Sequence, residues 1–418
     1  MHLINSFKRI FSLEKKIYIN IFSLFSINIL RFLINIITLP HLIKVYGPNS
    51  WGKIVILQII INYFIWLTDW SLDQHSSKLI SIYEGNEHNQ KQIFKSSISA
   101  QLILLIISLI LINLYGFLFA TYKEVFLYSN LIVIGNFINP FWYLNGREKI
   151  YETAIIQLLN KLIFAFLILN MINNNSLISE YFFYMGISSI SVGLFFLIIL
   201  QIRYKIAFFK YDFKSGLIII RSSFKLFLSE IWGNFTNSII PIVITNLIGN
   251  FELGIFNIAD RIKSIAVQIM HPITYTLFPR MSKKYALEKQ SANKSFLKII
   301  FFSSLIVIGI YFITNLYINQ IVNFFSKEYA NQITALLRIL LFSFILNVFS
   351  DQFITYYFIP NNMYNFINNN KVIKFVICIS LIFPLLLNYG IIGAAYAYII
   401  SEFISLCLII RKYSNTKL

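Results

Sequence analysis

The sequence predicts an all-α membrane protein with about 12 transmembrane helices in two six-helix bundles, and three observations predict it. First, 57% of the 418 residues are hydrophobic and only 12% are charged, whereas charged residues make up about 25% of ordinary soluble domains. Second, charge-free runs of about 20 residues, the helix length that spans a bilayer, recur along the chain. Third, the two halves share a spacing of glycine and polar residues.

Twelve segments are predicted to cross the membrane. Several of the apolar segments contain no charged residue, and other apolar segments contain one or more. One further apolar segment is interrupted by Arg338 and Asp351. The turn signal at Asn388, Tyr389 and Gly390 divides the last apolar run into two helices. The predicted helices cover residues 17–38, 51–72, 96–116, 124–144, 151–171, 179–202, 224–249, 252–278, 296–318, 331–359, 371–388 and 390–411.

The basic residues predict the orientation in the membrane. The chain has 35 Lys and Arg against 17 Asp and Glu, and the net charge of +18 would suggest a nucleic-acid partner in a soluble protein. With both termini in the cytoplasm, 26 of the 35 fall in cytoplasmic segments and four in outer segments, as the positive-inside rule expects. We therefore expect cytoplasmic termini and no nucleic acid. No spacing of histidine or cysteine predicts a metal site.

An internal repeat divides the chain. A shift of 202 residues aligns Gly47 with Gly249 and Gly52 with Gly254, so that the pattern G-x4-G recurs after the first helix of each half. Because each half has an even number of helices, both insert with the same orientation, which is typical of transporters. A chance alignment of two common turns is the alternative. The predicted parts are an N-terminal bundle at 1–203, a cytoplasmic linker at 204–223 and a C-terminal bundle at 224–418.

Polar residues inside the apolar helices form stripes on single helix faces. A charge at mid-membrane costs about 2.5 to 3.5 kcal/mol, so such residues normally face a bundle interior or a wet cavity. We expect the stripes to line a central cavity with surplus positive charge, which suits an anionic cargo such as a phosphate or carboxylate. The substrate-binding candidates are Asn28, Arg31, Asn35, Lys161, Asn234, Asn237, Arg261 and Lys263, and the ion-coupling candidates are Asp69, Glu230 and Asp260.

Several of these charges have a structural alternative. Asp260 and Arg261 would neutralise each other as a pair, and Asp69 would be hydrated at the inner interface. Arg338 is expected to extend to the outer interface. Glu402, near the middle of the last helix, is the acid that is hardest to explain as structural.

Five short motifs are spread over nearly the whole chain. They are LP at 39–40 with YGPNSWG at 46–52, LTDW at 67–70, NPFWYLNGRE at 139–148, ADRI at 259–262 and LFPRMS at 277–282. In this order they resemble the motifs of bacterial polysaccharide-unit flippases, the O-antigen flippase (Wzx-like) group. The group belongs to the multidrug, oligosaccharidyl-lipid and polysaccharide exporter superfamily.

The resemblance implies two six-helix bundles that form a V-shaped alternating-access transporter. It also implies that the protein is not an enzyme. The cargo would be undecaprenyl-pyrophosphate-linked oligosaccharide, carried from the inner to the outer leaflet of the bacterial cytoplasmic (inner) membrane for O-antigen or a related surface polysaccharide. Arg31 and Arg261 are the first matches to the basic residues of the family's cavity, and Lys161 and Lys263 are the second. Glu230 adds a negative charge, so the charge of this cavity is more mixed. A proton or sodium gradient would drive transport without a cofactor. The implied partners are the lipid-linked oligosaccharide, membrane lipids, a polysaccharide polymerase and a chain-length regulator.

Other functions are less consistent with the sequence. A membrane-embedded polysaccharide polymerase or glycosyltransferase needs an outer loop large enough for an active site, and every predicted outer loop is short. A multidrug or small-organic exporter of the same superfamily is the main alternative, because fold does not fix cargo. An exporter of cationic drugs would nevertheless favour an acidic cavity. A structural scaffold would give the intramembrane charges no function to offset their cost.

Overall fold

The computed structural model describes residues 2–118, 120–208 and 210–417, and these residues form helices and connecting turns without a β-strand. Hydrophobic chains in a bilayer satisfy their backbone hydrogen bonds within helices, so this outcome follows from the composition. The side chains that are not described belong to residues 2–26, 28, 29, 31, 32, 120, 229, 232, 233, 236, 237, 271–273, 275, 276, 279, 280, 286 and 417.

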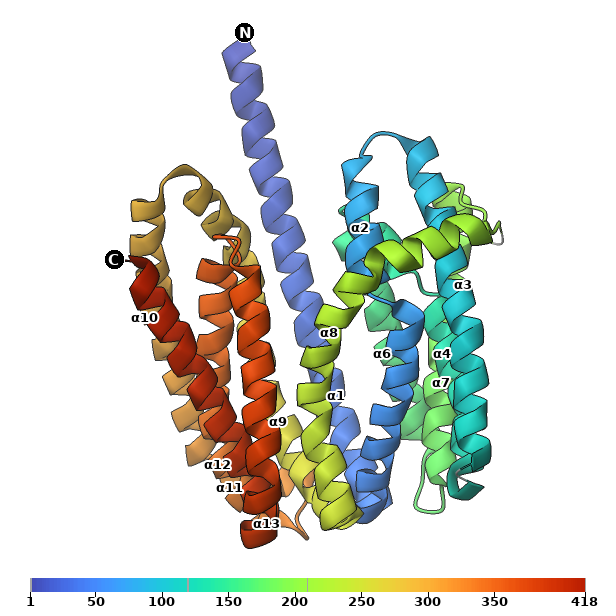
Figure 1. Cartoon of the computed structure of the whole chain (residues 1–418), viewed down its shortest axis with the longest axis vertical. Helices are drawn as coiled ribbons and strands as arrows, with labels where there is room; N and C mark the ends of the chain where they lie inside the picture. The colour runs from blue at the N-terminus through green and yellow to red at the C-terminus, as the bar shows by residue number, and fades with distance from the viewer. Residues whose placement is uncertain (1, 119, 209, 418) are drawn as a thin grey trace. The chain divides into compact units, whose positions relative to one another are not determined.

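The helices follow one another with short connections, and Figure 1 colours them in chain order. Those of the first part of the chain are α1 (His2–Asp69), α2 (Leu72–Ile82), α3 (Glu87–Leu118), the 3-10 turn η1 (Ala120–Tyr122), α4 (Lys123–Phe137), α5 (Phe141–Gly146), α6 (Ile150–Met171) and α7 (Ile178–Tyr204). They are followed by α8 (Phe213–Leu247), α9 (Asn250–Leu287), α10 (Lys289–Leu316), α11 (Ile318–Phe325), α12 (Ala330–Phe353), the π-helical turn η2 (Ile354–Phe358) and α13 (Tyr364–Lys417).

Two of these helices are interrupted by glycine. Gly47 in α1 has φ 62 and ψ 171, and Gly390 in α13 has φ 58 and ψ −145, so each element consists of two helical segments. Glycine reaches positive φ without the steric penalty of a Cβ atom. The turn predicted at the end of the first α13 segment is therefore confirmed, at Gly390.

The number of membrane crossings is consistent with the prediction of about twelve. Among the described residues, eight helical stretches are long and apolar enough to span a bilayer. Two of them, Leu33–Ile82 with 50 residues and Tyr364–Thr416 with 53, are long enough for two crossings of about 20 residues each. Each of the twelve predicted segments lies mostly within helices of the structure. The predicted class, an all-α membrane protein, is confirmed.

The chain forms two compact units. The first comprises residues 1–38 and 58–230, and the second comprises residues 39–57 and 231–418. The second unit thus includes the turn that follows the first helical segment of α1, together with α9 to α13. The first unit ends within α8, at Glu230.

Aromatic side chains fill part of the interior of each unit. In the first unit the ring of Phe94 lies 5.3 Å, centre to centre, from both Trp142 and Tyr143. In the second unit Tyr357 and Tyr413 meet edge to face at 4.7 Å. Aromatic pairs favour such tilted and edge-to-face arrangements, and each is worth about 0.5 to 1.5 kcal/mol beyond the area it buries.

The two G-x4-G turns pack against each other within the second unit. A Cβ atom on Gly52 would lie 1.8 Å from the carbonyl oxygen of Asn250, and one on Gly254 would lie 1.9 Å from that of Pro48. The second turn also contains Gly249, with φ 138. The paired glycines are therefore required by the close approach of two backbones, which no side chain would permit.

Candidate functional site

Arg261 is anchored beside the first G-x4-G turn, within the second unit. Its Nε donates to Asn257 Oδ1 at 2.9 Å, and the same oxygen accepts from Trp51 Nε1 at 3.2 Å. The guanidinium carbon lies 5.1 Å from the centre of the Trp51 ring, and Trp51 is buried. A cation over the face of tryptophan is attracted by the ring's π electrons. This arrangement fixes the position of one predicted cargo-binding cation.

Lys263 is paired with Asp260 on the same helix, α9. Lys263 Nζ lies 2.5 Å from Asp260 Oδ1, with 7% of the lysine side chain exposed and 35% of the aspartate. Residues three apart on a helix lie on one face, which explains the pair. The ammonium also lies 4.6 Å from the centre of the Tyr398 ring on α13. The predicted cation Lys263 is thus neutralised by the predicted ion-coupling acid Asp260.

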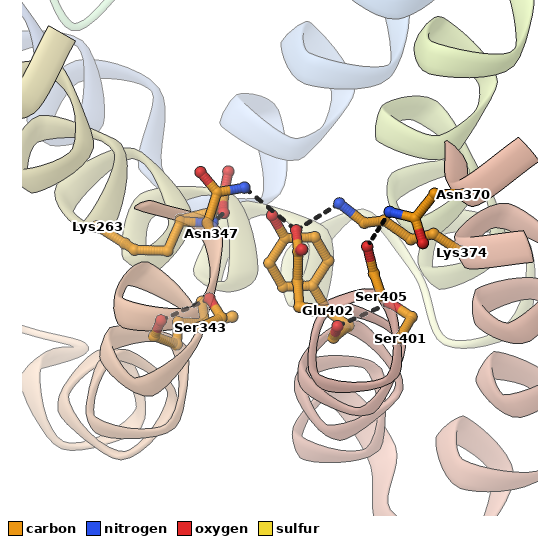
Figure 2. Close-up of polar contacts among 11 residues, drawn as sticks. Lys263, Ser343, Asn347, Asn370, Lys374, Ser401, Glu402 and Ser405 are labelled. Carbon is orange, nitrogen blue, oxygen red and sulfur yellow. Dashed lines mark hydrogen bonds and ion pairs between the residues drawn. The ribbon is translucent and has the colours of Figure 1, made fainter. Parts of the chain in front are cut away.

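A second buried ion pair joins the two segments of α13. Lys374 Nζ contacts Glu402, whose side chain is 1% exposed. Asn347 on α12 donates its side-chain amide to Glu402 Oε1 at 3.2 Å, and the hydroxyl of Tyr398 is hydrogen-bonded to the same carboxylate. Figure 2 shows Lys374 and Asn347 pointing toward Glu402 from different helices.

Sequence reasoning missed this pair in part. In the sequence Glu402 is an acid in need of an explanation, whereas Lys374 counts only as one of the 26 basic residues of the predicted cytoplasmic segments. The signal that would have found it is the burial cost of an isolated carboxylate, which requires a nearby cation. Lys374 lies early in the helical segment that precedes Gly390 and is 28 residues from its partner.

The first unit contains a separate group of acids. Asp69, at the end of α1, accepts a hydrogen bond from Asn136 Nδ2 at 2.7 Å and a longer one from Gln101 Nε2 at 3.5 Å. The Gln101 side chain in turn accepts from Trp142 Nε1 at 3.4 Å. The carboxylate of Asp69 is therefore held by amide groups of α3 and α4 and not merely hydrated.

Glu230 lies near Asp69 in the same unit. Its carboxylate accepts hydrogen bonds of 2.5 Å from Ser71 Oγ and from Gln74 Nε2. Ser71 has the left-handed conformation, with φ 56, at the break between α1 and α2. Asp69, Asp73 and Glu230 are close enough to interact electrostatically. The structure thus brings two of the three predicted ion-coupling acids together, and Asp260 belongs to the other unit.

The other predicted cavity residues are distributed over both units. Asn35 on α1 is half-buried and Lys161 on α6 is exposed, both in the first unit, and Asn234 on α8 is half-buried in the second. Among the side chains that the structure describes, no group of three or more His, Cys, Asp and Glu residues is arranged to hold a metal ion. The side chains of Asn28, Arg31 and Asn237 lie outside the described residues.

Comparison with known sequences identifies several similar proteins. The model of the polysaccharide biosynthesis protein family matches residues 17–285. A putative O-antigen transporter of Escherichia coli (strain K12) is 22% identical over 399 residues, covering 93% of this chain and 94% of the relative. The capsular polysaccharide biosynthesis protein CapF of Staphylococcus aureus is 28% identical over 185 residues, covering 43% of this chain and 46% of that protein.

Two solved structures with the same fold are a transporter and a flippase. An inward-facing multidrug resistance MATE family transporter of the MOP superfamily has a TM-score of 0.72 at 14% identity, covering 91% of this chain and 96% of that chain. The lipid II flippase MurJ, in an inward closed conformation, has a TM-score of 0.73 at 15% identity, covering 94% and 87%.

These comparisons confirm the predicted transporter fold and the predicted resemblance to polysaccharide-unit flippases. They also confirm the prediction of a transport protein and not an enzyme, because the O-antigen relative and both structural neighbours are named as transporters or flippases.

Proposed function

The chain belongs to the polysaccharide biosynthesis protein family, and on that basis we propose that it is a flippase for lipid-linked oligosaccharide. The cargo would be undecaprenyl-pyrophosphate-linked repeat units of O-antigen or a related surface polysaccharide. They would move from the inner to the outer leaflet of the bacterial cytoplasmic membrane. The observation that carries the proposal is the cationic side chain of Arg261, anchored on Trp51 among the helices of a MATE- and MurJ-like fold.

The chemistry of that arginine suits the head group of such a lipid. A guanidinium presents several N–H donors in a planar fork that matches phosphate oxygens, and it stays charged at any physiological pH. The polyprenyl tail of the cargo would stay in the hydrocarbon while the pyrophosphate and its sugars enter a wet passage. Intramembrane charges normally face such passages because lipid contact is costly.

Ion coupling would use the acids of the first unit. Asp69, Asp73 and Glu230 repel one another when all are ionised, and binding of a proton or a sodium ion relieves that repulsion. Uptake of the ion would therefore change the charge at the break between α1 and α2, where Ser71 contacts Glu230. Asp260 is the corresponding candidate in the second unit.

The proposed orientation places both termini in the cytoplasm, with 26 of the 35 basic residues in cytoplasmic segments. The protein would then receive cargo from cytoplasmic enzymes and release it to a polysaccharide polymerase and a chain-length regulator on the outer side. Membrane lipids surround it, and no nucleic acid is involved.

Deletion of the gene tests the function. The expected result is loss of surface polysaccharide, with lipid-linked units retained in the cytosolic leaflet, and restoration by the wild-type gene. The variant Arg261→Ala should fail to restore it, whereas Arg338→Ala, which removes an exposed arginine of α12, should succeed at equal membrane abundance. Unchanged surface polysaccharide in the deletion strain would contradict the function. Full activity of both Arg31→Ala and Arg261→Ala would contradict the assigned site.

A multidrug or small-organic exporter is the second candidate, supported by the likeness to a MATE family transporter. Such an exporter would protect the cell from organic cations. Loss of resistance to cationic dyes in the deletion strain, with surface polysaccharide intact, would favour this alternative. The anchored Arg261 argues against it, because a cation at the cargo site repels cationic drugs.

A further inference from the structure

Two lysines share one aromatic ring in the second unit. The ammonium of Lys263 lies 4.6 Å and that of Lys374 lies 5.7 Å from the centre of the Tyr398 ring. The two nitrogens are therefore within about 10 Å of each other, although one lysine comes from α9 and the other from α13. A pair of cations this close attracts a polyvalent anion more strongly than either cation alone.

Each lysine is paired with its own carboxylate, and the two carboxylates differ in how they are held. A third acid, Asp351, lies close enough to Lys374 and Glu402 to interact with them electrostatically. Glu402 is 1% exposed and accepts from Lys374, Asn347 and Tyr398. Asp260 is 35% exposed, and its described contact is the ion pair with Lys263 on the same helix. Glu402 is thus fixed by three groups, whereas the more accessible Asp260 is the carboxylate that an incoming anion can replace.

Burial of the Lys263 ammonium and of the Lys374–Glu402 pair is difficult to explain as a source of stability. Removing two charges from water costs about as much as their attraction returns, and apolar replacements of buried ion pairs are often neutral or stabilising. Arg261 is one residue from Asp260 and is anchored through Asn257, so this stretch of α9 carries two predicted cargo-binding cations. A function in anion binding accounts for the cost.

We propose that Lys263 and Lys374 form a binding site for the phosphate groups of an isoprenyl pyrophosphate, and that Asp260 occupies this site as an internal counter-ion until the pyrophosphate displaces it. The proposal rests on the proposed flippase function and extends it to residues of α13. Phosphate oxygens would replace the Asp260 carboxylate at Lys263, so the lysine never loses an anionic partner during the exchange. Glu402 and Asn347 are positioning residues that hold Lys374 toward Tyr398.

Binding of radiolabelled farnesyl pyrophosphate to the purified full-length protein in detergent tests the exchange. Lys263→Gln should raise Kd by about tenfold or more, because a charge-assisted contact to phosphate is lost. Asp260→Asn should lower Kd by about threefold or more, because the internal competitor is removed. A structural role for Asp260 predicts the opposite, so an Asp260→Asn variant that binds as weakly as Lys263→Gln would overturn the proposal.

Three controls separate binding from folding. Asp260→Glu keeps the competing charge and should therefore bind more weakly than Asp260→Asn. The double variant Lys374→Gln/Glu402→Gln removes both members of the ion pair together and should still bind weakly. Lys371→Gln removes an exposed charge one turn before Lys374 and should leave Kd unchanged. If Lys374→Gln/Glu402→Gln binds as tightly as wild type, Lys374 is not part of the site.

Competing ligands identify the source of the anion. Excess unlabelled inorganic pyrophosphate should displace the label weakly and farnesol should not displace it, because the site recognises phosphate while the isoprenyl chain adds affinity. Equal displacement by farnesol and farnesyl pyrophosphate would show that the lysines contribute nothing, which overturns the site. The deletion experiment decides separately on the flippase function, because loss of surface polysaccharide does not depend on where the pyrophosphate binds.

Discussion

Gly254→Ala should weaken the second unit at the point where its two G-x4-G turns meet. The added Cβ would lie 1.9 Å from the carbonyl oxygen and 2.6 Å from the carbonyl carbon of Pro48. Carbon atoms do not approach backbone oxygens closer than 3.0 Å, so the two backbones would have to separate by about 1.1 Å. Overpacking of this kind costs about 1 to 3 kcal/mol in free energy of unfolding.

Unfolding of the purified protein by SDS in mixed micelles, followed by circular dichroism, measures this loss. Gly309→Ala is the matched control, because nothing lies within 4 Å of a Cβ at that helical position. That change should be neutral or should stabilise α10 by about 0.5 to 1 kcal/mol, since alanine is the better helix former. A Gly254→Ala variant as stable as Gly309→Ala would refute the close approach of the turns.

A double-mutant cycle sharpens the same prediction. Gly52→Ala alone should cost a similar amount, because its Cβ would lie 1.8 Å from the carbonyl oxygen of Asn250. Once either alanine has separated the turns, the second meets a contact that is already relaxed. The double variant Gly52→Ala/Gly254→Ala should therefore lose less than the sum of the two single losses. Strict additivity would indicate that the two glycines act at independent contacts.

Two further predictions concern side-chain hydrogen bonds. Trp51→Phe removes the indole donor to Asn257 but keeps a ring at that position, so we expect a loss of about 1 kcal/mol in unfolding free energy; a loss above that of Trp51→Ala would contradict this reading. Hydrogen bonds from Ser215 at the start of α8 hold the pKa of Asp212 below its ordinary value. A depressed pKa means that the cap is present at neutral pH and is lost as the pH falls through the folded-state pKa. Hydrogen exchange at the Ser215 amide, corrected for intrinsic rates, should accelerate in the wild type only at pH values below the ordinary pKa of aspartate, and it should be fast throughout in Asp212→Ala. Equal protection in both proteins would exclude the cap.

The fold could be predicted largely from the sequence because a bilayer permits few solutions. Apolar runs of sufficient length must be helices, and a polar turn with glycine must separate two of them, as at Gly390. The boundary between the compact units was harder to foresee. Residues 39–57 join the second unit through backbone contacts of Gly52 and Gly254, which depend on packing between segments far apart in the sequence.

The candidate site could be predicted in its residue types but not in its pairings. The structural alternative in the sequence gave the adjacent Arg261 as the partner of Asp260, whereas the structure pairs Asp260 with Lys263, three positions along the same helix face. Lys374 and Glu402 gave no such local signal, because the break at Gly390 lies between them and only tertiary packing brings them together. Their basic and acidic side chains were visible in the sequence, but their contact was not.

The mutual packing of the two G-x4-G turns limits how this protein can be recombined with its relatives. The backbone of each turn lies too close to the glycine of the other turn for a side chain to fit there. A substitution in one turn therefore depends on the sequence of the other turn. A chimaera that takes one half from this chain and the other from a homologue should therefore retain both turns from a single parent. Crossovers placed between Gly52 and Gly254 separate two turns that contact each other in this structure, and they will need compensating changes in the opposite turn.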